Sequence, residues 1–303
     1  MPQFVPPRVV AQLMTNERLA LTCGILAVLL WSTVATGFKL GLTVLAPTQL
    51  LFVGSTVSLT FFAAALVATG RMRALLLLDT RQLANIAGLG LLNPAIYYLI
   101  LFEAYDRLPA QIAQPLNYTW AITLALLAVP ILKQPLTRRT LLGIVVSYVG
   151  VAVLLTTGAS ITKQGLDPLG VALALISTLV WSSYWLLSVR MGGDTLINLC
   201  VGFAVGTPIV AAVCAFTTGL PPLSISTIGY GAWVGLIEMG VTFLLWQTAL
   251  NRTGNAGRMG QLIFLSPFIS LVLIDRVLGE AVAPSSIIAL LMIVAGIVVA
   301  RRD

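Results

Sequence analysis

The sequence predicts an all-α membrane protein, with ten transmembrane helices arranged as two inverted-topology five-helix repeats around a central cavity. Three observations support this prediction. Hydrophobic residues make up 58% of the 303-residue chain and charged residues only 9%, whereas a soluble domain has roughly a half and a quarter. Apolar runs of membrane-spanning length recur along the chain. The two halves of the chain also match one another at a nearly constant offset.

The apolar runs are each close to the ~20 residues that a helix needs to cross a bilayer. A membrane β-barrel would instead show segments of about ten residues with alternating polarity, and these are absent from the sequence. The runs cover residues 19–42, 47–69, 83–105, 110–132, 139–157, 167–189, 195–217, 228–250, 259–278 and 283–300.

The distribution of basic residues predicts the orientation of these helices. With the N-terminus placed inside, only four of the 17 Lys and Arg residues fall at or beyond the outer side, which leaves thirteen inside. An excess of Lys and Arg marks cytoplasmic loops, so both termini and the tail of residues 1–17 are expected in the cytoplasm. The four outer residues are Lys39, Arg107, Lys163 and Arg276.

Self-similarity divides the chain into residues 18–158 and residues 159–303. The best matches are Trp31-Ser32 with Trp181-Ser182 at an offset of 150, Ala104–Arg107 with Ala249–Arg252 at 145, and Lys133–Thr137 with Gly279–Ala283 at 146. Because five helices is an odd number, the second half must enter the membrane in the opposite orientation. Inverted repeats of this kind are typical of transporters, whose substrate sites lie near the midplane. Transport is therefore the leading class, by analogy.

Prolines interrupt several of the predicted helices. Pro94, Pro115, Pro208 and Pro267 lie in mid-span, and each removes a backbone hydrogen bond that protein or cavity water must replace. Pro115 and Pro267 fall in corresponding helices of the two halves, and paired interruptions point to a binding site. The alternative for any one proline is a kink that serves packing alone.

Aromatic rings and polar groups gather inside the same spans. A stripe of rings such as Trp181, Tyr184 and Trp185 is more often core than site, but amides and hydroxyls accompany these rings. Stacking faces combined with a few polar groups suit a planar or aromatic ligand. The predicted cavity residues are Trp31, Tyr97, Gln114, Asn117, Tyr118, Trp120, Trp181, Tyr184, Trp185 and Gln247.

Ionisable residues are rare within the spans, which makes each one a candidate functional group. Glu238 lies near the predicted midplane and is a candidate proton carrier or partner for a substrate ammonium group. The alternative is a neutral carboxylic acid hydrogen-bonded between helices. Glu103 and Lys39 lie near the outer ends of their helices, where long side chains can also reach the interface.

Several chemistries lack their usual residues in this sequence. The chain has no histidine, and its three cysteines, Cys23, Cys200 and Cys214, show no C-x-x-C spacing. It also lacks a phosphate-binding Gly-rich loop with lysine. We therefore expect no enzyme activity, metal or cofactor, no nucleic-acid partner and no ATPase subunit. The expected partners are the lipid bilayer and a small-molecule substrate.

The pattern of motifs resembles the EamA branch of the drug/metabolite transporter superfamily. The resemblance covers both halves and rests on Leu30–Thr33, Asn117–Trp120, the aromatic run 181–184 and Gly279-Glu280. Asn-Tyr-x-Trp is the most specific of these and resembles the superfamily's bacterial exporters of aromatic amino acids. The resemblance implies an inner-membrane exporter of aromatic or other neutral amino acids, and of some toxic amphiphiles.

The chain departs from the family pattern at Gln134, at Gln114-Pro115 and at Ala121. These departures bear on the substrate rather than on the fold. Two alternatives stay open at this point. One is a multidrug or nucleotide-sugar type of transporter with the same fold, and the other is a membrane receptor or pore that does not transport.

Overall fold

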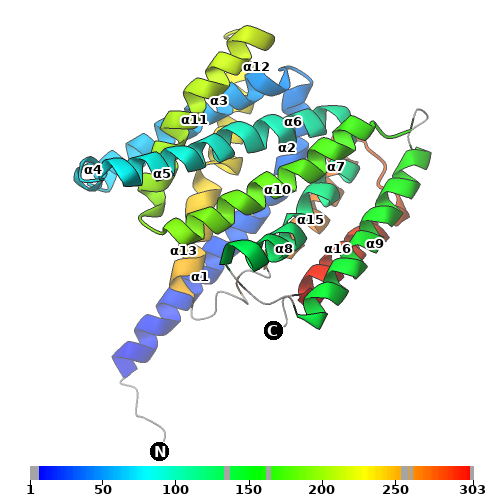
Figure 1. Ribbon diagram of the computed structural model, residues 1–303, viewed down its shortest axis with the longest axis horizontal. Coiled ribbons are helices and arrows are strands. Elements are labelled where there is room, and N and C mark those ends of the chain that lie inside the picture. The colour runs from blue at the N-terminus through cyan, green and yellow to red at the C-terminus, as the bar shows by residue number, and fades with distance from the viewer. Residues whose placement is uncertain (1–6, 133–136, 162–164, 254–258, 260–261, 301–303) are drawn as a thin grey trace, which may run out of the picture.

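Helices are the regular elements of the computed structural model, which describes residues 7–132, 137–161, 165–253, 259 and 262–300 (Figure 1). Within these residues, eight helical segments are long and apolar enough to cross a membrane. They match the first eight predicted runs, and the prediction of a multi-pass helical membrane protein is confirmed. The eight segments are Glu17–Leu42, Pro47–Ala68, Thr80–Arg107, Ala110–Ile131, Arg138–Thr157, Pro168–Ser188, Thr195–Thr217 and Ile225–Ala249.

Four of these eight spans consist of more than one helix, and the other four are single helices. The elements of residues 7–161 are α1 (Pro7–Ser32), α2 (Val34–Leu42), α3 (Pro47–Ala68), α4 (Met72–Leu76), α5 (Thr80–Gly90), η1 (Leu91–Ile96), α6 (Tyr97–Arg107), α7 (Ala110–Tyr118), α8 (Trp120–Leu132) and α9 (Arg138–Ile161). Those of the rest are α10 (Pro168–Met191), α11 (Thr195–Thr217), α12 (Ile225–Trp233), η2 (Val234–Glu238), α13 (Val241–Arg252), η3 (Leu262–Leu265), α15 (Ser266–Leu273), η4 (Ile274–Leu278) and α16 (Pro284–Ala300). The labels η1, η2 and η4 denote π-helical turns, and η3 denotes a 3₁₀ turn.

The last two predicted spans are shorter than the others in the described part of the chain. The ninth is seen as η3, α15 and η4, and the tenth as a short apolar helix over Pro284–Val299. At the other end, α1 begins at Pro7 rather than at residue 19. The predicted tail of residues 1–17 therefore begins to form helix well before the apolar run.

Side-chain caps start several helices at their observed positions. Asp167 accepts hydrogen bonds from the backbone N–H groups of Leu169 and Gly170 and so begins α10. Asp194 does the same for α11, through Leu196 and Ile197. Such caps satisfy backbone donors that a helix end leaves without an intrahelical partner.

The positions of the helix breaks correct the prediction in part. Pro94 lies in η1, beside Asn93, whose backbone is not helical (φ −141°, ψ 117°), and Pro267 is the second residue of α15, just after the η3 turn. Pro115 and Pro208 instead lie inside the continuous helices α7 and α11. Of these four prolines, only Pro267 lies near a helix start, where a proline costs little because the first N–H groups have no intrahelical acceptor. The chain after Pro115 is interrupted only at Thr119, between α7 and α8.

One break has no proline at all. The span that contains α12 and α13 is interrupted by η2 and by Gly240, whose backbone angles (φ −111°, ψ −97°) are not helical. Its position matches that of η1 in the earlier span. Adding 145 to the bounds of α5 gives 225 and 235, close to those of α12, and adding 145 to those of α6 gives 242 and 252, close to those of α13.

Glycines bring two pairs of helices into backbone contact near these breaks. A Cβ atom on Gly90 of α5 would lie 2.5 Å from the carbonyl oxygen of Gly202 in α11, and one on Gly235 of η2 would lie 2.5 Å from that of Gly54 in α3. Gly54 and Gly202 are 148 residues apart, and adding 148 to Pro47, the start of α3, gives Thr195, the start of α11. Glycine is needed here because any side chain would hold the helices apart.

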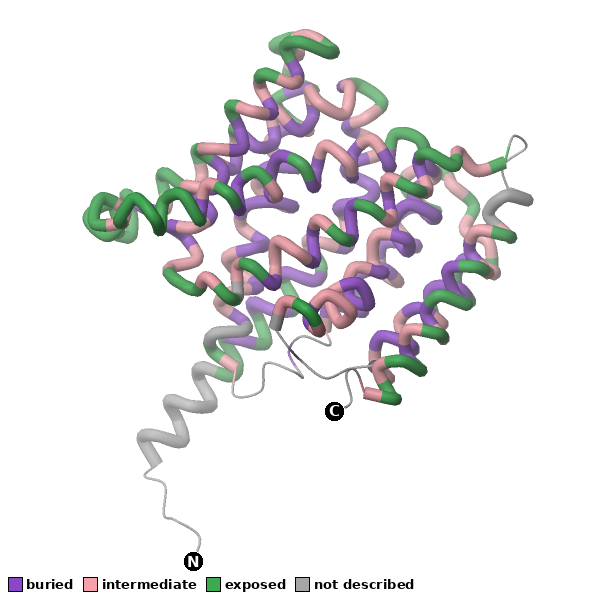
Figure 2. Tube along the Cα trace, viewed as in Figure 1, coloured by how far each residue is buried: buried purple, intermediate pink, exposed green. Residues whose placement is uncertain are grey.

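The helix pair α9 and α16 lies at one edge of the molecule (Figure 1). Ser147 donates a hydrogen bond to the carbonyl of Ile293 (3.0 Å), and Gly150 and Gly296 allow close approach. Buried residues lie on the inner sides of the helices, and exposed residues follow the periphery (Figure 2). Large apolar side chains such as Leu142, Val145 and Ile288 are exposed there, as expected of surfaces that face lipid.

Candidate functional site

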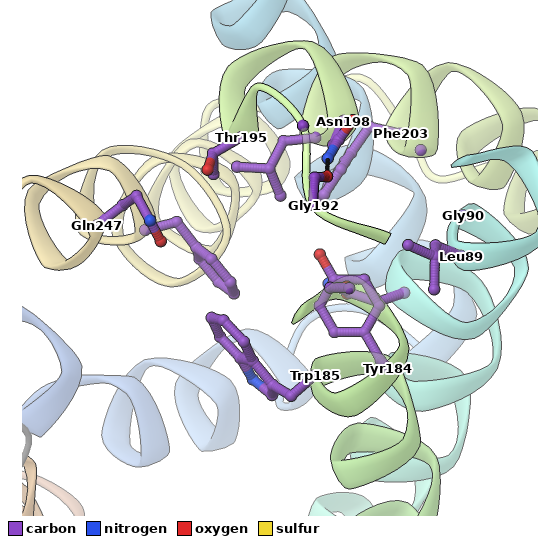
Figure 3. A pocket seen from close by; sticks show the side chains of 15 residues that line it. Leu89, Gly90, Tyr184, Trp185, Gly192, Thr195, Asn198, Phe203 and Gln247 are labelled. Atoms are coloured by element: carbon purple, nitrogen blue, oxygen red, sulfur yellow. Dashed lines mark hydrogen bonds between the residues drawn. The ribbon is translucent and has the colours of Figure 1, made fainter. Parts of the chain in front are cut away.

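A cavity of about 220 Å³ lies where α5, η1, α10, α11 and α13 meet (Figure 3). Its walls combine aromatic rings with amides and hydroxyls. The lining residues are Leu89, Gly90, Asn93, Tyr184, Trp185, Ser188, Gly192, Gly193, Thr195, Asn198, Leu199, Gly202, Phe203, Phe243 and Gln247. None of these residues carries a charge, so the described lining favours a neutral or zwitterionic ligand.

Rings from α10 and α13 form one wall of the cavity. Trp185 stacks on Phe243 with a centroid distance of 6.3 Å and an interplanar angle of 5°. Figure 3 shows Trp185 and Tyr184 extending from α10 toward the space that Gln247 approaches from α13. Apolar faces with polar groups at their edges are typical of pockets that orient a ligand.

Two polar side chains that lack standard hydrogen bonds also line the cavity, beside Tyr184. Asn93 is 98% buried, since its exposed fraction is 2%, and within the described structure neither its amide nitrogen nor its amide oxygen has a hydrogen-bond partner. The buried hydroxyl of Ser188 is in the same state. The Tyr184 hydroxyl faces both groups without forming a hydrogen bond of good geometry. An unsatisfied buried polar group costs about 1–3 kcal/mol, so these groups are available to a ligand.

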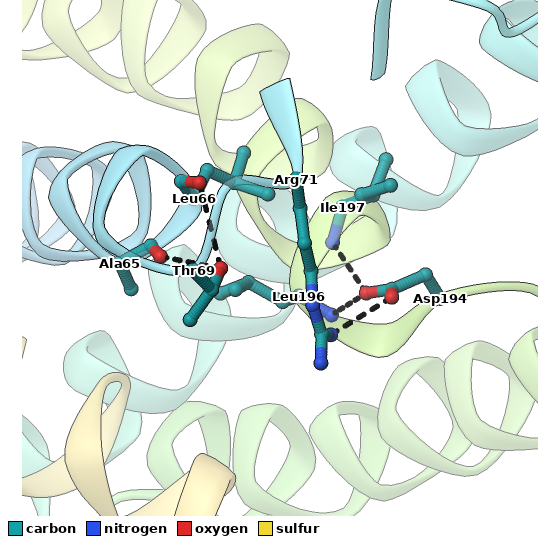
Figure 4. A network of polar contacts seen from close by, with 7 residues as sticks. All are labelled: Ala65, Leu66, Thr69, Arg71, Asp194, Leu196 and Ile197. Carbon is teal, nitrogen blue, oxygen red and sulfur yellow. Dashed lines mark hydrogen bonds and ion pairs between the residues drawn. The ribbon is translucent and has the colours of Figure 1, made fainter. Parts of the chain in front are cut away.

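The loop between α10 and α11 forms the mouth of the cavity. Gly192 and Gly193 have positive φ angles (68° and 89°), which glycine adopts without strain. The amide of Asn198 donates to the carbonyl of Gly192 over 2.8 Å, a hydrogen bond visible in Figure 3. Asp194, next to the mouth, accepts a hydrogen bond of 2.8 Å from Arg71 at the end of α3 (Figure 4).

Five of the seven predicted aromatic residues belong to one connected cluster of rings, in which Phe243 links Trp31 to the others, and two of the five face the cavity directly. Tyr184 and Trp185 line it. Trp181 lies behind them, stacked on Tyr97 at 4.4 Å and on Tyr184 at 5.7 Å. Trp31 contacts Phe243 edge to face at 5.9 Å. Gln247, the predicted amide of the same span, also lines the cavity.

The predicted residues of α7 and α8 pack against α10 and α15, and none is among the lining residues of the described cavity. Asn117 donates to Ser177 (3.1 Å) and to the Tyr97 hydroxyl (3.4 Å). The backbone carbonyl of Trp120 accepts a hydrogen bond from Ser182 (2.9 Å). Gln114 is buried, and in the described structure its side-chain oxygen has no partner. Tyr118 faces Ser266 of α15.

The three predicted ionisable residues lie apart from the cavity. Glu238 is buried and accepts a hydrogen bond from the Tyr98 hydroxyl over 3.0 Å. Lys39 donates to the backbone carbonyls of Tyr105 (2.9 Å) and Leu108 (3.0 Å). Neither of these side chains pairs with Glu103.

Glu103 belongs to an ion-pair network at the end of α6. It pairs with Arg107 at 2.6 Å, and Arg107 also pairs with Asp167 at 3.1 Å. The hydrogen bond from the Arg107 guanidinium holds the pKa of the Asp167 carboxyl below its usual value. Pairs this exposed contribute little stability, typically about 0–1 kcal/mol.

Sequence reasoning missed four polar lining residues, Asn93, Ser188, Thr195 and Asn198. One signal could have identified Asn93, because it precedes Pro94 in mid-span and the residue before a proline avoids the helical conformation. No comparable signal marks Ser188 and Asn198. Among the described residues, no group of three His, Cys, Asp or Glu side chains could hold a metal ion.

The comparisons with known proteins identify the family. The model of the EamA-like transporter family matches the chain twice, over residues 18–156 and over residues 168–302. The chain belongs to the EamA-like transporter family. The predicted resemblance to the EamA branch is thereby confirmed, and the protein is a multi-pass membrane protein of a transporter family.

Curated relatives agree with this assignment. An uncharacterized transporter of Clostridium kluyveri is 25% identical over 73% of this chain and 73% of its own length. Protein PecM of Dickeya dadantii is 22% identical over 70% and 72%, respectively. A crystal structure with a TM-score of 0.65 and 22% identity covers 93% of this chain and 96% of the chain it aligns to, and it supports the fold alone.

Proposed function

We propose that this protein is a transporter of the bacterial inner membrane that exports aromatic or other neutral amino acids and related metabolites. One observation carries the proposal: the cavity between α10 and α13 pairs the ring faces of Tyr184 and Trp185 with the amide of Asn93, which forms no hydrogen bond of good geometry. Rings suit an aromatic side chain, and a neutral amide suits the polar end of a zwitterion.

The volume of the cavity supports a small substrate. At about 220 Å³ it lies below the ~300–1,000 Å³ typical of pockets for drug-sized ligands. A single amino acid is closer to this size than a nucleotide sugar. The cavity volume thus favours an amino acid over a drug-sized compound or a nucleotide sugar. Multidrug or nucleotide-sugar transport stays the alternative within the same fold.

We also propose that the chain forms ten membrane helices in two inverted repeats, residues 18–158 and 159–303, which rock against each other. Support comes from the matching breaks η1 and η2 and from the matching bounds of α3 and α11. Two related halves with opposite orientations can expose one central site to each side of the membrane in turn.

Orientation follows from the positive-inside rule, with both termini in the cytoplasm. The cavity mouth lies at the same end as Arg71, which pairs with Asp194, and near Arg190. These basic residues support a cytoplasmic position for the mouth, as expected of an exporter that loads its substrate from within.

Flux through purified protein tests the function. In proteoliposomes loaded with radiolabelled phenylalanine or tryptophan, we expect saturable efflux that unlabelled substrate inhibits. The measurement is run with and without a proton gradient, to detect coupling. A pore would give flux without saturation or competition, and a receptor would bind substrate without moving it. Either result would contradict the proposal, whereas saturable flux of a different substrate would favour the multidrug or nucleotide-sugar alternative.

The orientation has its own test. Lys163 lies outside the described residues, between α9 and α10, in a loop expected on the outer side. In a background without the native cysteines, Lys163→Cys should react with a membrane-impermeant thiol reagent added to intact cells. Arg71→Cys is the matched control on the opposite side and should react only after permeabilisation. The reverse pattern would invert the topology.

A further inference from the structure

Asn93 and Glu238 occupy equivalent positions in the two halves. They are 145 residues apart, the offset that relates α5 and α6 to α12 and α13. Each belongs to a π-helical turn that interrupts a span, and the glycine three residues earlier, Gly90 or Gly235, makes the close helix contact described above. The same local construction thus presents an amide in one half and a carboxylate in the other.

The remaining walls of the cavity also have equivalents around Glu238. Offsets of 145, 150 and 148 relate the spans containing α13, α10 and α11 to those containing α6, α2 and α3. The equivalent pairs are Phe243 with Tyr98, Gln247 with Phe102, Ser188 with Phe38, Asn198 with Leu50, Leu199 with Leu51, and Gly202 with Gly54.

These equivalents are all buried, whereas Ser188, Asn198 and Gln247 of the cavity are half-buried. Phe38, Leu50 and Phe102 have exposed fractions of 1%, 0% and 0%. The rings of Phe38 and Phe102 lie 4.4 Å apart, centroid to centroid, and Phe38 also contacts Tyr105 at 5.4 Å. One of two related regions is therefore open and the other closed, as alternating exposure of a site requires.

Glu238 lies at the inner limit of the closed region. Its carboxylate accepts the hydrogen bond from Tyr98, and it belongs to none of the ion pairs of the described residues. A buried carboxylate without a cationic partner is costly in its charged form and is rarely kept without a role.

The ionisable groups around Glu238 are mostly tyrosines. Those that interact with it are Tyr97, Tyr98, Tyr105 and Tyr118. The elements packed against η2 are α1, α2, α3, α12 and α13. Their described side chains add Glu17, Arg18, Cys23, Lys39, Tyr230 and Arg252.

We propose that the region around Glu238 is a second binding pocket, which opens to the opposite side of the membrane when Phe38 separates from Phe102. The pocket takes a positively charged group at Glu238, either the ammonium group of a small aromatic amine or amino acid, or a proton. This inference rests on the proposed alternating exposure of the two halves. A carboxylate in place of the Asn93 amide gives the two pockets different preferences for charge, so that the ligand meets different chemistry on each side.

Single cysteines at equivalent positions test the pocket without reference to flux. Leu51→Cys lies in the closed region and Leu199→Cys in the open cavity, both in a background lacking Cys23, Cys200 and Cys214. In oriented membranes, L199C should react with an impermeant thiol reagent from the cavity side. L51C should react only from the opposite side, and at least tenfold more slowly. Reaction of L51C from the cavity side, or no reaction from either side, would overturn the proposed pocket.

Ligand protection identifies the charge that the pocket accepts. Phenethylamine should slow the labelling of L51C several-fold, phenylpropionate should not, and the additional substitution E238Q should abolish the protection. If a proton is the ligand, acidification alone slows the labelling of L51C, and this slowing is lost when E238Q is added. Phenethylamine then gives no further protection. Equal protection by the anion, or protection that survives E238Q, would refute the role of Glu238. Efflux from proteoliposomes is measured separately with the unsubstituted protein. The absence of efflux there would refute the proposed transport function rather than the role of Glu238.

Discussion

Replacing Gly90 by alanine is expected to destabilise the protein by about 1–3 kcal/mol, the usual cost of forcing extra atoms into a packed interface. The new Cβ atom would lie 2.5 Å from the carbonyl oxygen of Gly202 and 2.9 Å from its Cα atom. Both are backbone atoms, so α5 and α11 must move apart as units. Thermal unfolding of the purified protein in detergent, followed by tryptophan fluorescence, measures the loss.

Gly88 provides a matched control in the same helix. A Cβ atom at this position has no heavy atom within 4 Å, so Gly88→Ala should leave stability unchanged or raise it, because alanine favours helix by about 1 kcal/mol over glycine. Gly235→Ala, at the equivalent position in the second half, should behave like Gly90→Ala, since its Cβ atom would meet the carbonyl of Gly54 at 2.5 Å. Equal melting temperatures for the Gly88 and Gly90 variants would show that the helix contact is unimportant.

Replacing Trp185 by alanine is expected to raise the KM for an aromatic substrate at least tenfold, while the protein still reaches the membrane. Trp185 lines the cavity and stacks on Phe243, so its loss removes a ring face on which the substrate can pack. An aromatic pair contributes about 0.5–1.5 kcal/mol beyond its buried area, and about 1.4 kcal/mol corresponds to a tenfold change in affinity. Concentration-dependent efflux from proteoliposomes gives the value.

The control for this change is Tyr148→Ala, which removes a 44% exposed ring from α9 at the edge of the molecule. It should leave KM unchanged. Trp185→Phe should restore most of the affinity, because it keeps a ring in the cavity wall. If the alanine variant transports with the KM of the unsubstituted protein, the substrate does not bind against Trp185.

Much of the fold is predictable because lipid imposes simple constraints on the sequence. Apolar runs of spanning length mark the first eight segments to within a few residues, since every backbone group in a membrane must be satisfied within its own helix. Proline is a less certain guide. Pro208 lies within an uninterrupted helix, whereas Gly240 marks a break that no proline accompanies. Neighbouring helices decide these outcomes, and a single sequence does not reveal them.

The site is predictable only in part, for a related reason. Tyr184, Trp185 and Gln247 stand out as polar or aromatic residues in apolar runs, and they line the cavity. Asn117 and Trp120 stand out equally but pack between helices in this structure. Periodicity shows that residues share a helix face, but it does not show whether that face meets a cavity or another helix. Ser188 and Asn198 line the cavity because the loop between α10 and α11 brings the ends of these two helices together.

The pairing of α9 with α16 has a consequence for biosynthesis. On α9, Ser147 donates a hydrogen bond to the carbonyl of Ile293 and lies against Gly296 of α16, and Gly150 lies against the carbonyl of Ala289. Since α16 begins at Pro284, α9 remains without this partner until that part of the chain has been translated. Nascent chains that stop short of residue 284 therefore leave Ser147 and Gly150 of α9 without the helix that covers them in the finished fold.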